Sequence, residues 1–505
     1  MRRSSTRGTE VRRRSARRKH CTVFLKGAVI LRIGVCVSRN DFFYDIHSLV
    51  KSFYPEDEVK IYAEGDPEAD VSGFGFVIPV EVPPYTDRKD AKDKVKRELY
   101  HRLSSATGTA LPWGMLSGIR PTKIPMALLR AGGTEEECIR ILTEENLVSP
   151  EKAALATEIA AREIGILSGI PLTEKSYSLY IHIPFCPTIC AYCTFSSNPY
   201  AVWRKMGNAY LKALLGELRF RHRQYMEEGY DPCPTTVYIG GGTPTTLSAG
   251  ELDALLAGIR EIWDLDGIRE FTVEAGRPDS ITEEKLHVLL KHGVTRISVN
   301  PQTMDDASLA RIGRSHTAAD TVRAFHMARE AGFANINMDM IIGLPGEGTE
   351  QVLNTLAAIR ELGPDSLTVH ALALKRASAF RTSIIEDRLK DTEADRGAFR
   401  GLAYGDAAEQ MRLASGCAAE MGMEPYYLYR QKNMRGNLEN TGFAVPGYAC
   451  LYNILIMEEL QSILAFGAGA STKYVFPDGR IERTVSPKDI GTYFGKMQQL
   501  FPLQF

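Results

Sequence analysis

Three cysteines close together are the strongest chemical signal in the sequence. The segment YIHIPFCPTICAYC places Cys186, Cys190 and Cys193 at CxxxCxxC spacing. Soft thiolates spaced so closely select iron–sulfur clusters or zinc. A structural zinc site needs four protein ligands, whereas an iron–sulfur cubane held by three cysteines leaves one iron open to chelate the amino acid end of a cofactor. The spacing therefore predicts a [4Fe-4S] cluster; the alternative is a zinc loop completed by His182 or by a distant cysteine.

A glycine-rich segment is the second signal. Residues 240–245 read GGGTPT, and the missing side chains would let a ligand approach the backbone closely. The segment lacks the GK[ST] ending of a phosphate-binding loop, so an unspecialised tight turn is the alternative interpretation. Polar residues that could each be a helix cap or a surface charge stand at or near the ends of later apolar runs. These residues are Glu274, Gln302, Arg314 and Asp339.

The elements that must position these residues repeat regularly from residue 177. Ser248 with Glu251 and Ser280 with Glu283 have the spacing of capping boxes, and Gly332 is placed to end a helix. Alternating strands and helices imply a parallel sheet with right-handed crossovers. We therefore predict an α/β fold in which six units curl into a partial TIM-like barrel, with the chemistry at the carboxyl ends of its strands. The strands are expected near residues 178–183, 235–239, 270–274, 296–300, 335–342 and 366–372.

The rest of the chain divides by composition and pattern. The first residues are rich in arginine and serine and cannot form a packed core. We predict a disordered basic tail at 1–20, a small α/β domain at 21–105, a helical connector at 106–174, the barrel core at 175–375 and a C-terminal region that covers the substrate at 376–505.

Composition excludes several kinds of partner. The chain has 505 residues and a formal net charge of -1, so it has no strong long-range field, and nucleic acid is not expected as a partner. The apolar run from Cys21 to Val37 is interrupted by Lys26 and Arg32, so no membrane span is expected. The nine cysteines, three of them clustered, suit a reducing compartment better than a disulfide framework. We expect a cytoplasmic protein.

Taken together, the motifs resemble a known family. The CxxxCxxC spacing with an aromatic residue, Tyr192, before the last cysteine is similar to the radical S-adenosylmethionine (SAM) superfamily, whose fold is a (β/α)6 partial barrel. The lead-in YxHIPFC resembles the oxygen-independent coproporphyrinogen III oxidase family. The sequences LPWGMLSGIRPTK and YYLYRQKNMRGNLEN resemble its HemZ-type branch, the coproporphyrinogen dehydrogenases.

The resemblance implies a site for SAM, either one molecule or two. The GGGTPT segment resembles the family segment that binds the amino group of SAM, and the polar residues at later strand ends recur in the family's order. Such residues suit the cofactor, because a carboxylate accepts two hydrogen bonds from ribose hydroxyls and a guanidinium pairs with a carboxylate through two. The SAM contacts implied are Tyr180, Tyr192, Gly241, Gly242, Thr243, Glu274, Gln302, Arg314, Asp339 and Ala373, beside a [4Fe-4S] cluster on Cys186, Cys190 and Cys193.

The resemblance also implies a reaction. The reduced cluster cleaves SAM to methionine and a 5′-deoxyadenosyl radical, which takes hydrogen from a propionate of coproporphyrinogen III. Loss of carbon dioxide leaves a vinyl group, and two such steps give protoporphyrinogen IX in porphyrin and haem biosynthesis. The partners implied are this or a related tetrapyrrole and a one-electron donor such as flavodoxin or ferredoxin. Tyr426 to Asn433, with Arg430 and Lys432, could line the macrocycle site or form an ordinary amphipathic surface.

One position departs from the family pattern. Established oxidases continue as CxxxCxxCxC, whereas Phe195 stands two positions after Cys193. HemW-type relatives, which bind haem and deliver it as chaperones, also show CxxxCxxCxF. A haem chaperone that uses His182, His316, His370 or a cysteine as axial ligand is therefore the first alternative. A radical SAM enzyme acting on RNA or another substrate is the second, although the sequence shows no basic or OB-type module beyond the tail.

Overall fold

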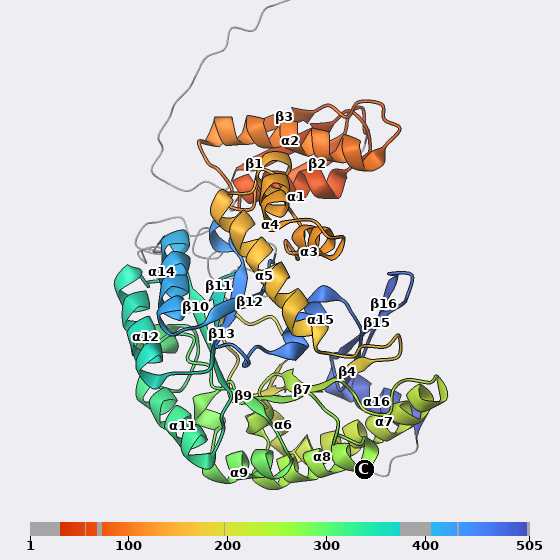
Figure 1. Ribbon diagram of the computed structural model, residues 1–505, viewed down its shortest axis with the longest axis vertical. Helices are drawn as coiled ribbons and strands as arrows, with labels where there is room; N and C mark the ends of the chain where they lie inside the picture. Colours follow the sequence, from red (N-terminus) through yellow and green to blue (C-terminus); the bar gives the residue numbers. More distant parts are fainter. Residues whose placement is uncertain are drawn as a thin grey trace, which may run out of the picture.

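Separate hydrophobic cores divide the chain into a small N-terminal domain and a large barrel, joined by a helical connector (Figure 1). The structure is a computed structural model that describes residues 31–55, 57–67, 73–195, 197–373, 406–431 and 434–501. The predictions for residues 1–20, for the first part of the region 376–505 and for Lys432 and Asn433 lie outside these residues. No helix in the described part of the chain is long and apolar enough to cross a membrane.

The N-terminal domain is a parallel sheet with strand order β2-β1-β3 that shares one core with two helices. The central strand is buried because Ile33, Val35 and Val37 alternate along it and are fully enclosed. Asp87 caps the longer helix by accepting hydrogen bonds from two backbone amides, and Gly108 ends it in the left-handed conformation. The elements are β1 (Arg32–Val37), α1 (Phe43–Phe53), β2 (Glu58–Ala63), β3 (Phe76–Val80) and α2 (Arg88–Thr107).

The connector is tied to the barrel by buried polar contacts. Trp113 Nε1 and Lys152 Nζ donate to the two carboxylate oxygens of the fully buried Glu439, over 2.7 and 2.8 Å. In Figure 1 the longest helix of the connector, α5, runs from the N-terminal domain down to the barrel. The helices are α3 (Lys123–Arg130), α4 (Glu135–Arg140), which continues into a π-helical turn, and α5 (Pro150–Ser168).

Six parallel strands form the barrel core in the order β4-β7-β8-β9-β10-β11, which confirms the predicted β/α repeats. The strands are β4 (Tyr177–Ile183), β7 (Thr236–Gly241), β8 (Glu270–Glu274), β9 (Arg296–Ser298), β10 (Ile336–Ile342) and β11 (Ser366–Ala371). The helices are α7 (Gly207–Glu227), α8 (Ala249–Ile262), α9 (Glu283–Lys291), α10 (Asp306–Arg311), α11 (Ala318–Ala331) and α12 (Thr349–Leu362). Between β4 and α7 lie the short elements β5 (Phe185–Cys186), β6 (Asn198–Pro199) and α6 (Tyr200–Trp203).

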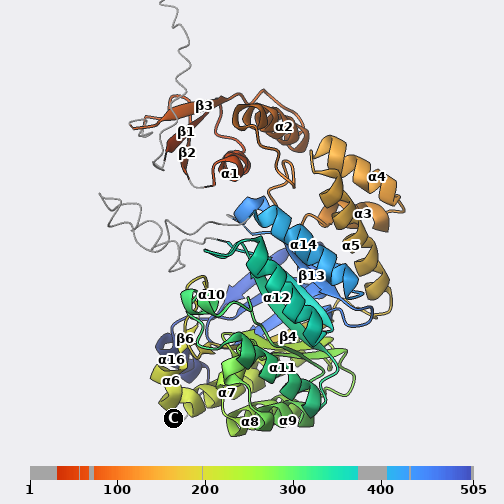
Figure 2. The same ribbon diagram turned by 90° about the vertical axis from the view of Figure 1, so that its left-hand side faces the viewer.

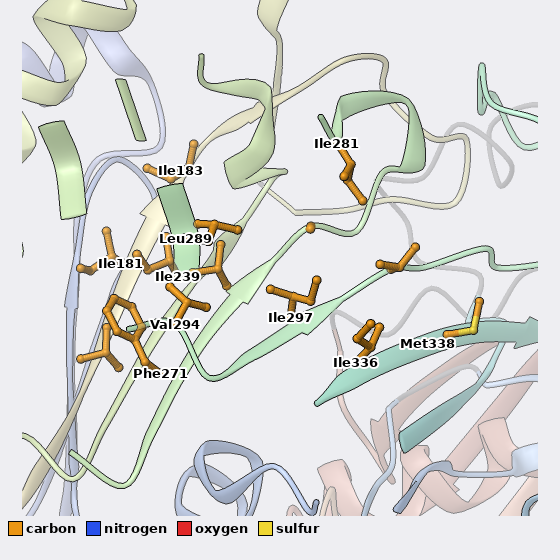
Figure 3. Close-up of a cluster of buried hydrophobic side chains, with 14 of the residues drawn as sticks. Ile181, Ile183, Ile239, Phe271, Ile281, Leu289, Val294, Ile297, Ile336 and Met338 are labelled. Carbon is orange, nitrogen blue, oxygen red and sulfur yellow. The ribbon is translucent and has the colours of Figure 1, made fainter. Parts of the chain in front are cut away.

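Apolar side chains on one face of these strands pack under the helices (Figure 3). Ile181, Ile239 and Phe271 come from neighbouring strands, and Leu289 and Val294 from α9 and the turn after it; all five are at most 3% exposed. Burying such a side chain contributes about 1.5–3 kcal/mol. The opposite face of the same strands carries polar and aromatic side chains.

The helix boundaries test the predicted caps. Ser248 and Glu251 form a capping box, and Gly332 ends α11 with φ 113°, so both predictions are confirmed. The predicted capping box of Ser280 with Glu283 is wrong, because Ser280 does not cap α9. Residues Pro278–Ser280 form a 3-10 turn, so α9 begins two residues later and Thr282 is its cap.

The described part of the C-terminal region extends the sheet at both edges. Strands β12 and β13 continue it antiparallel beyond β11, whereas β14 pairs parallel with β4 and leads into the hairpin β15–β16. Helix α14 lies beside α12 (Figure 2). The elements are α14 (Ala407–Glu420), β12 (Glu424–Tyr429), β13 (Asn440–Ala444), α15 (Leu451–Glu458), β14 (Ser462–Phe466), β15 (Ser471–Val475), β16 (Ile481–Val485) and α16 (Ile490–Leu500).

Candidate active site

The cysteines of the CxxxCxxC motif lie in the loop after the first barrel strand. Cys186 ends the short strand β5, and Cys190 and Cys193 share one turn, closed by a 3.0 Å hydrogen bond from the Cys193 amide to the Cys190 carbonyl. The Ala191 amide donates to the Ile312 carbonyl over 3.0 Å and so holds this loop to the segment after α10. All three thiols are unbridged and partly exposed.

Three thiols on one loop are the ligand type that an iron–sulfur cluster needs, although burial opposes loss of the proton from Cys186 and Cys193. Burial raises the pKa of Cys186 to about 11, although the Thr243 hydroxyl, 3.5 Å from its sulfur, opposes the rise. Burial also raises the pKa of Cys193. These thiols must lose protons to bind iron. Among the described residues, no three Cys, His, Asp or Glu side chains converge as ligands of a single metal ion, whereas the cysteines of a cubane each bind a different iron and stand farther apart.

The glycine-rich segment lies directly beside the cysteine loop. The Thr243 amide donates to the Phe185 carbonyl over 2.6 Å. A Cβ on Gly242 would lie 2.4 Å from that carbonyl oxygen, and one on Gly241, whose φ is 109°, would lie 2.6 Å from the His182 ring. On this side, the space left by the missing side chains is therefore filled by the protein's own strands.

Glu274 ends β8 among tyrosines. Its Oε1 accepts a 2.6 Å hydrogen bond from the Tyr238 hydroxyl. The Tyr238 ring stacks on Tyr452, with 4.5 Å between centroids, and lies 6.0 Å from the ring of Tyr180. Burial raises the pKa of Glu274 to about 7; the bond from Tyr238 opposes this rise and the charge of Asp339 adds to it. The carboxyl group can therefore exchange a proton near neutral pH.

Gln302 lies next to Asp339, a residue of the neighbouring strand. The backbone amide of Gln302 donates to the backbone carbonyl of Asp339 over 3.0 Å. Gln302 has a φ of 66°, in the left-handed region of backbone conformation. This conformation costs a non-glycine residue about 1–3 kcal/mol. The buried Gln302 Oε1 has no hydrogen-bond partner within the described structure. Burial would raise the pKa of Asp339, but His370, whose Nε2 lies 3.7 Å from Asp339 Oδ2, and a hydrogen bond from Asn337 overcome it and hold this pKa below its ordinary value. A strained backbone and an unpaired buried oxygen at one place point to a ligand.

Arg314 connects the cysteine loop to the barrel rim. Its Nη2 donates to the Tyr192 hydroxyl over 3.1 Å, and its Nη1 donates to the Asn300 and Gly276 carbonyls over 2.6 and 3.2 Å. Burial opposes its charge, but Tyr192 and Cys190 raise the pKa of Arg314 above its usual value. Its buried Nε has no partner among the described residues, so a charged donor remains for an anionic ligand.

The structure thus joins several predicted site residues in pairs: Thr243 with Cys186, Gln302 with Asp339, and Arg314 with Tyr192. Tyr180 lies near Glu274 through the tyrosine stack. Ala373 follows β11, the next strand after Asp339, and pairs with Met434 in an isolated bridge.

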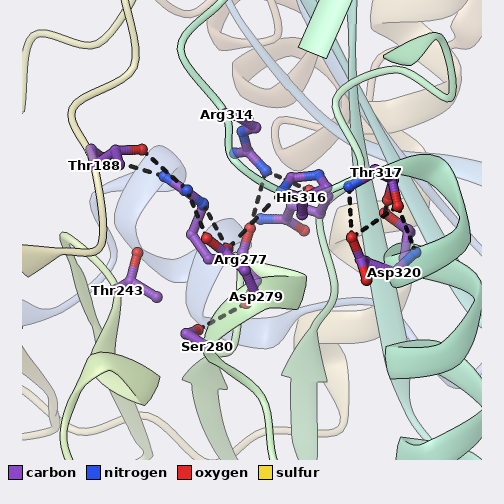
Figure 4. A network of polar contacts seen from close by, with 12 residues as sticks. Thr188, Thr243, Arg277, Asp279, Ser280, Arg314, His316, Thr317 and Asp320 are labelled. Carbon is purple, nitrogen blue, oxygen red and sulfur yellow. Dashed lines mark hydrogen bonds and ion pairs between the residues drawn. The ribbon is translucent and has the colours of Figure 1, made fainter. Parts of the chain in front are cut away.

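Sequence reasoning missed Arg277 and Asp279, and it considered His316 only as a haem ligand (Figure 4). Arg277 donates from Nε and Nη2 to the Asp279 carboxylate over 3.0 and 2.9 Å. Burial and the charge of Arg314 lower the pKa of His316 to about 4. The available signal is the pair of opposite charges, Arg277 and Asp279, which stand two residues apart shortly after Glu274.

The structure corrects two parts of the prediction around Tyr426, the amphipathic surface and the role of Arg430, whereas the tyrosines stay a predicted macrocycle lining because they share a buried cluster with Tyr180 and Tyr238. Tyr426 and Tyr427 belong to β12 and are buried, so the stretch is not an amphipathic surface. Arg430 donates to the Leu116 carbonyl and lies 5.8 Å from the centroid of the Trp113 ring. Arg430 therefore fastens the connector to the barrel, a role that the sequence around it could not show.

The fold is that of a radical SAM protein, and the model of the radical SAM superfamily matches residues 180–359. HemZ of Bacillus subtilis (strain 168), an oxygen-independent coproporphyrinogen-III oxidase-like protein, is 41% identical over 409 residues, which cover 80% of this chain and 78% of HemZ. The heme chaperone HemW of Lactococcus lactis is 31% identical over 59% of this chain and 70% of HemW. The solved structure of coproporphyrinogen III oxidase (HemN) from Escherichia coli matches with a TM-score of 0.50 at 22% identity, over 66% of this chain and 72% of HemN, and supports the fold.

The chain therefore belongs to the oxygen-independent coproporphyrinogen-III oxidase-like family of radical SAM proteins. Radical SAM proteins use a [4Fe-4S] cluster and SAM, as the sequence predicted. The three relatives named above are all named for coproporphyrinogen or for haem.

Proposed function

We propose that this protein oxidatively decarboxylates two propionate side chains of coproporphyrinogen III to vinyl groups and so forms protoporphyrinogen IX. The observation that carries the proposal is the 41% identity with HemZ across 78% of that protein. A soluble one-electron donor of the flavodoxin or ferredoxin kind would supply the reducing electron in the cytoplasm.

In this proposal Cys186, Cys190 and Cys193 hold the [4Fe-4S] cluster, and the strand-end residues hold SAM. When bound, these groups supply the one-electron cleavage of the sulfonium and the radical that takes hydrogen from the propionate. The chain's own contribution is to bind and orient the reactants and to exclude water from them.

The polar residues of the rim are suited to binding SAM, because some of their atoms have no hydrogen-bond partner among the residues that the structure describes. These atoms can therefore bind a ligand without losing a hydrogen bond to any of those residues. The Gln302 amide oxygen and the Arg314 Nε have no partner within the described structure. Asp339, with its lowered pKa, is ionised at neutral pH and can accept hydrogen bonds from two ribose hydroxyls. Glu274, when ionised, can accept from the ammonium group of an amino acid.

The tyrosine stack supports a flat substrate. Tyr180, Tyr238 and Tyr452 lie with interplanar angles of 20–26° beside Glu274. Stacked rings form an aromatic wall that excludes water and can pack against a macrocycle. This wall, together with the tyrosines of β12 in the same buried cluster and without Arg430, is the proposed lining of the substrate site.

A second candidate function is delivery of haem as a chaperone. It is favoured by Phe195, which stands where established oxidases have a further cysteine, and by the 31% identity with HemW of Lactococcus lactis. Because residue 195 is phenylalanine, this position adds no thiol beside the cluster loop, and its side chain is 68% exposed. A chaperone would bind haem stoichiometrically and leave coproporphyrinogen unchanged.

The deciding experiment is anaerobic. The protein, with its cluster reconstituted, is incubated with dithionite, SAM and coproporphyrinogen III, and 5′-deoxyadenosine and porphyrin products are quantified by chromatography. We expect deoxyadenosine and a divinyl product from the wild type and neither from Cys190→Ala. Cys233→Ala is the matched control, because Cys233 lies in the loop before β7 and outside the motif, and this variant should retain both products. An untouched porphyrinogen, together with one haem bound per chain, would instead establish the chaperone.

A further inference from the structure

Arg277 is buried where the cysteine loop meets the rim of the barrel (Figure 4). It follows β8 and is only 2% exposed. Its guanidinium donates in two directions: Nε and Nη2 grip the Asp279 carboxylate, whereas Nη1 and Nη2 reach the Thr188 carbonyl and hydroxyl, each over 3.1 Å. A bidentate partner on one side fixes the direction in which the other donors point.

Through Thr188, Arg277 fastens the first half of the cysteine loop. The Thr188 hydroxyl in turn donates to the Gly313 carbonyl over 2.9 Å. The stretch between Cys186 and Cys190 is therefore held to the strand ends by a guanidinium and by a second loop. The planar guanidinium group holds this loop rigidly, because its donors are fixed in one plane and lose little rotational freedom on forming hydrogen bonds.

The same guanidinium brings positive charge to a ligand sulfur. Arg277 Nη1 lies 3.9 Å from Cys190 Sγ, within hydrogen-bonding distance for sulfur. Arg314 acts electrostatically on the same cysteine. Both arginines are at most 8% exposed, so their charges are weakly screened by solvent. Asp279 offsets part of the charge of Arg277, but its carboxylate lies on the other side of the fork.

We propose that Arg277 is a positioning residue for the cluster: it locks the loop that carries Cys190 and eases reduction of the cluster by placing positive charge at that ligand. The inference rests on the proposed function only in that the three cysteines hold the cluster. Reduction adds one negative charge to the cluster, and a nearby cation stabilises the more negative state.

The first test is the midpoint potential of the reconstituted cluster, measured by redox titration with EPR detection. In Arg277→Met the equilibrium constant for one-electron reduction should fall about tenfold, a shift of about 59 mV to more negative potential. Arg277→Lys, which keeps the charge without the fork, should shift it less. Arg329→Met is the matched control, because Arg329 pairs with Asp365 over 2.7 Å at the opposite end of the strands.

The second test uses the iron-free protein and reads the loop directly. Amide hydrogen exchange in the cysteine loop, including the Ala191 amide, should become roughly tenfold faster in both Arg277 variants and stay unchanged in the control. A wild-type protein that assembles no cluster would refute the proposed function, whereas the exchange comparison would still decide the role of Arg277. An unchanged midpoint potential or unchanged exchange in Arg277→Met overturns the inference, and Arg277→Lys decides alone if the Met variant does not fold.

Discussion

The N-terminal domain and the barrel are both parallel sheets packed on helices, yet their buried polar groups differ sharply. Within the described residues 31–108, Lys96 is the one buried polar side chain. In the barrel, buried polar residues lie at both ends of the strands, with Glu270 and Arg296 at the starts of β8 and β9. Near the carboxyl ends, Gln302 and Arg314 each keep an atom that no described residue satisfies. Among the described residues, Arg97 Nε is the one buried side-chain atom of the small domain without a partner, whereas Gln302, Arg314 and His316 all have such atoms near the barrel rim. An unpaired buried polar atom is costly unless something else binds it, so the rim is the better candidate for a ligand site.

The largest expected effect separates the two regions by stability. Ile33 is fully buried in the central strand of the N-terminal domain. Ile33→Ala should lower the free energy of unfolding of that domain by about 2–5 kcal/mol, because it leaves a cavity. Denaturant titration measures this loss, and cluster content and SAM affinity should not change. A fall in SAM affinity would mean that the small domain takes part in the site.

The next effect is a pH dependence at the rim. His316 has a pKa of about 4 in the folded protein, against about 6.5 in the unfolded chain. Below pH 6.5 the unfolded chain takes up a proton that the folded protein does not, so this residue's contribution to stability is lost as the pH falls from 6.5 to 4. Relative to His316→Gln, the wild type should lose up to about 3 kcal/mol over that range. Urea titrations at several pH values measure it, with the exposed His287 as the matched control; parallel curves for wild type and His316→Gln would contradict it.

Two buried glutamines differ in whether the protein satisfies the hydrogen bond of the side-chain oxygen. Gln302→Met should raise the dissociation constant of SAM about tenfold and change the stability of the SAM-free protein by less than about 1 kcal/mol. Gln410 is fully buried and accepts a 2.8 Å hydrogen bond from the Gly343 amide. Gln410→Met should therefore do the reverse, lowering stability and sparing SAM affinity. Equilibrium dialysis and thermal unfolding of both variants provide the test, and equal losses of SAM affinity would refute it.

The smallest effect concerns a cap on the outside of the barrel. Thr282 accepts a hydrogen bond from the Lys285 amide at the start of α9. Thr282→Ala should cost about 1 kcal/mol of stability and leave the rim unaffected. Chemical denaturation measures the loss. If Ser280→Ala, rather than Thr282→Ala, weakened α9 while leaving the turn intact, the cap assignment would be wrong.

The sequence predicted the six strands because apolar runs and glycine punctuation repeat at regular intervals, and it identified the cysteine loop because CxxxCxxC is local. It did not predict contacts that depend on distant segments meeting. Arg430 finds its partners in the connector, more than 300 residues earlier in the chain. The 3-10 turn at Pro278–Ser280 displaced a cap that spacing alone had placed, and the left-handed backbone of Gln302 follows from pairing with β10.

We propose that the three cysteines hold a cluster to which SAM binds through the strand-end residues. The most direct measurement is the EPR spectrum of the reduced, reconstituted protein before and after addition of SAM. We predict a cluster signal that changes on addition of SAM and that is absent in Cys190→Ala. In Gln302→Met the same change should require about tenfold more SAM. A cluster that assembles equally in Cys190→Ala, or a wild-type signal that does not respond to SAM, would contradict it.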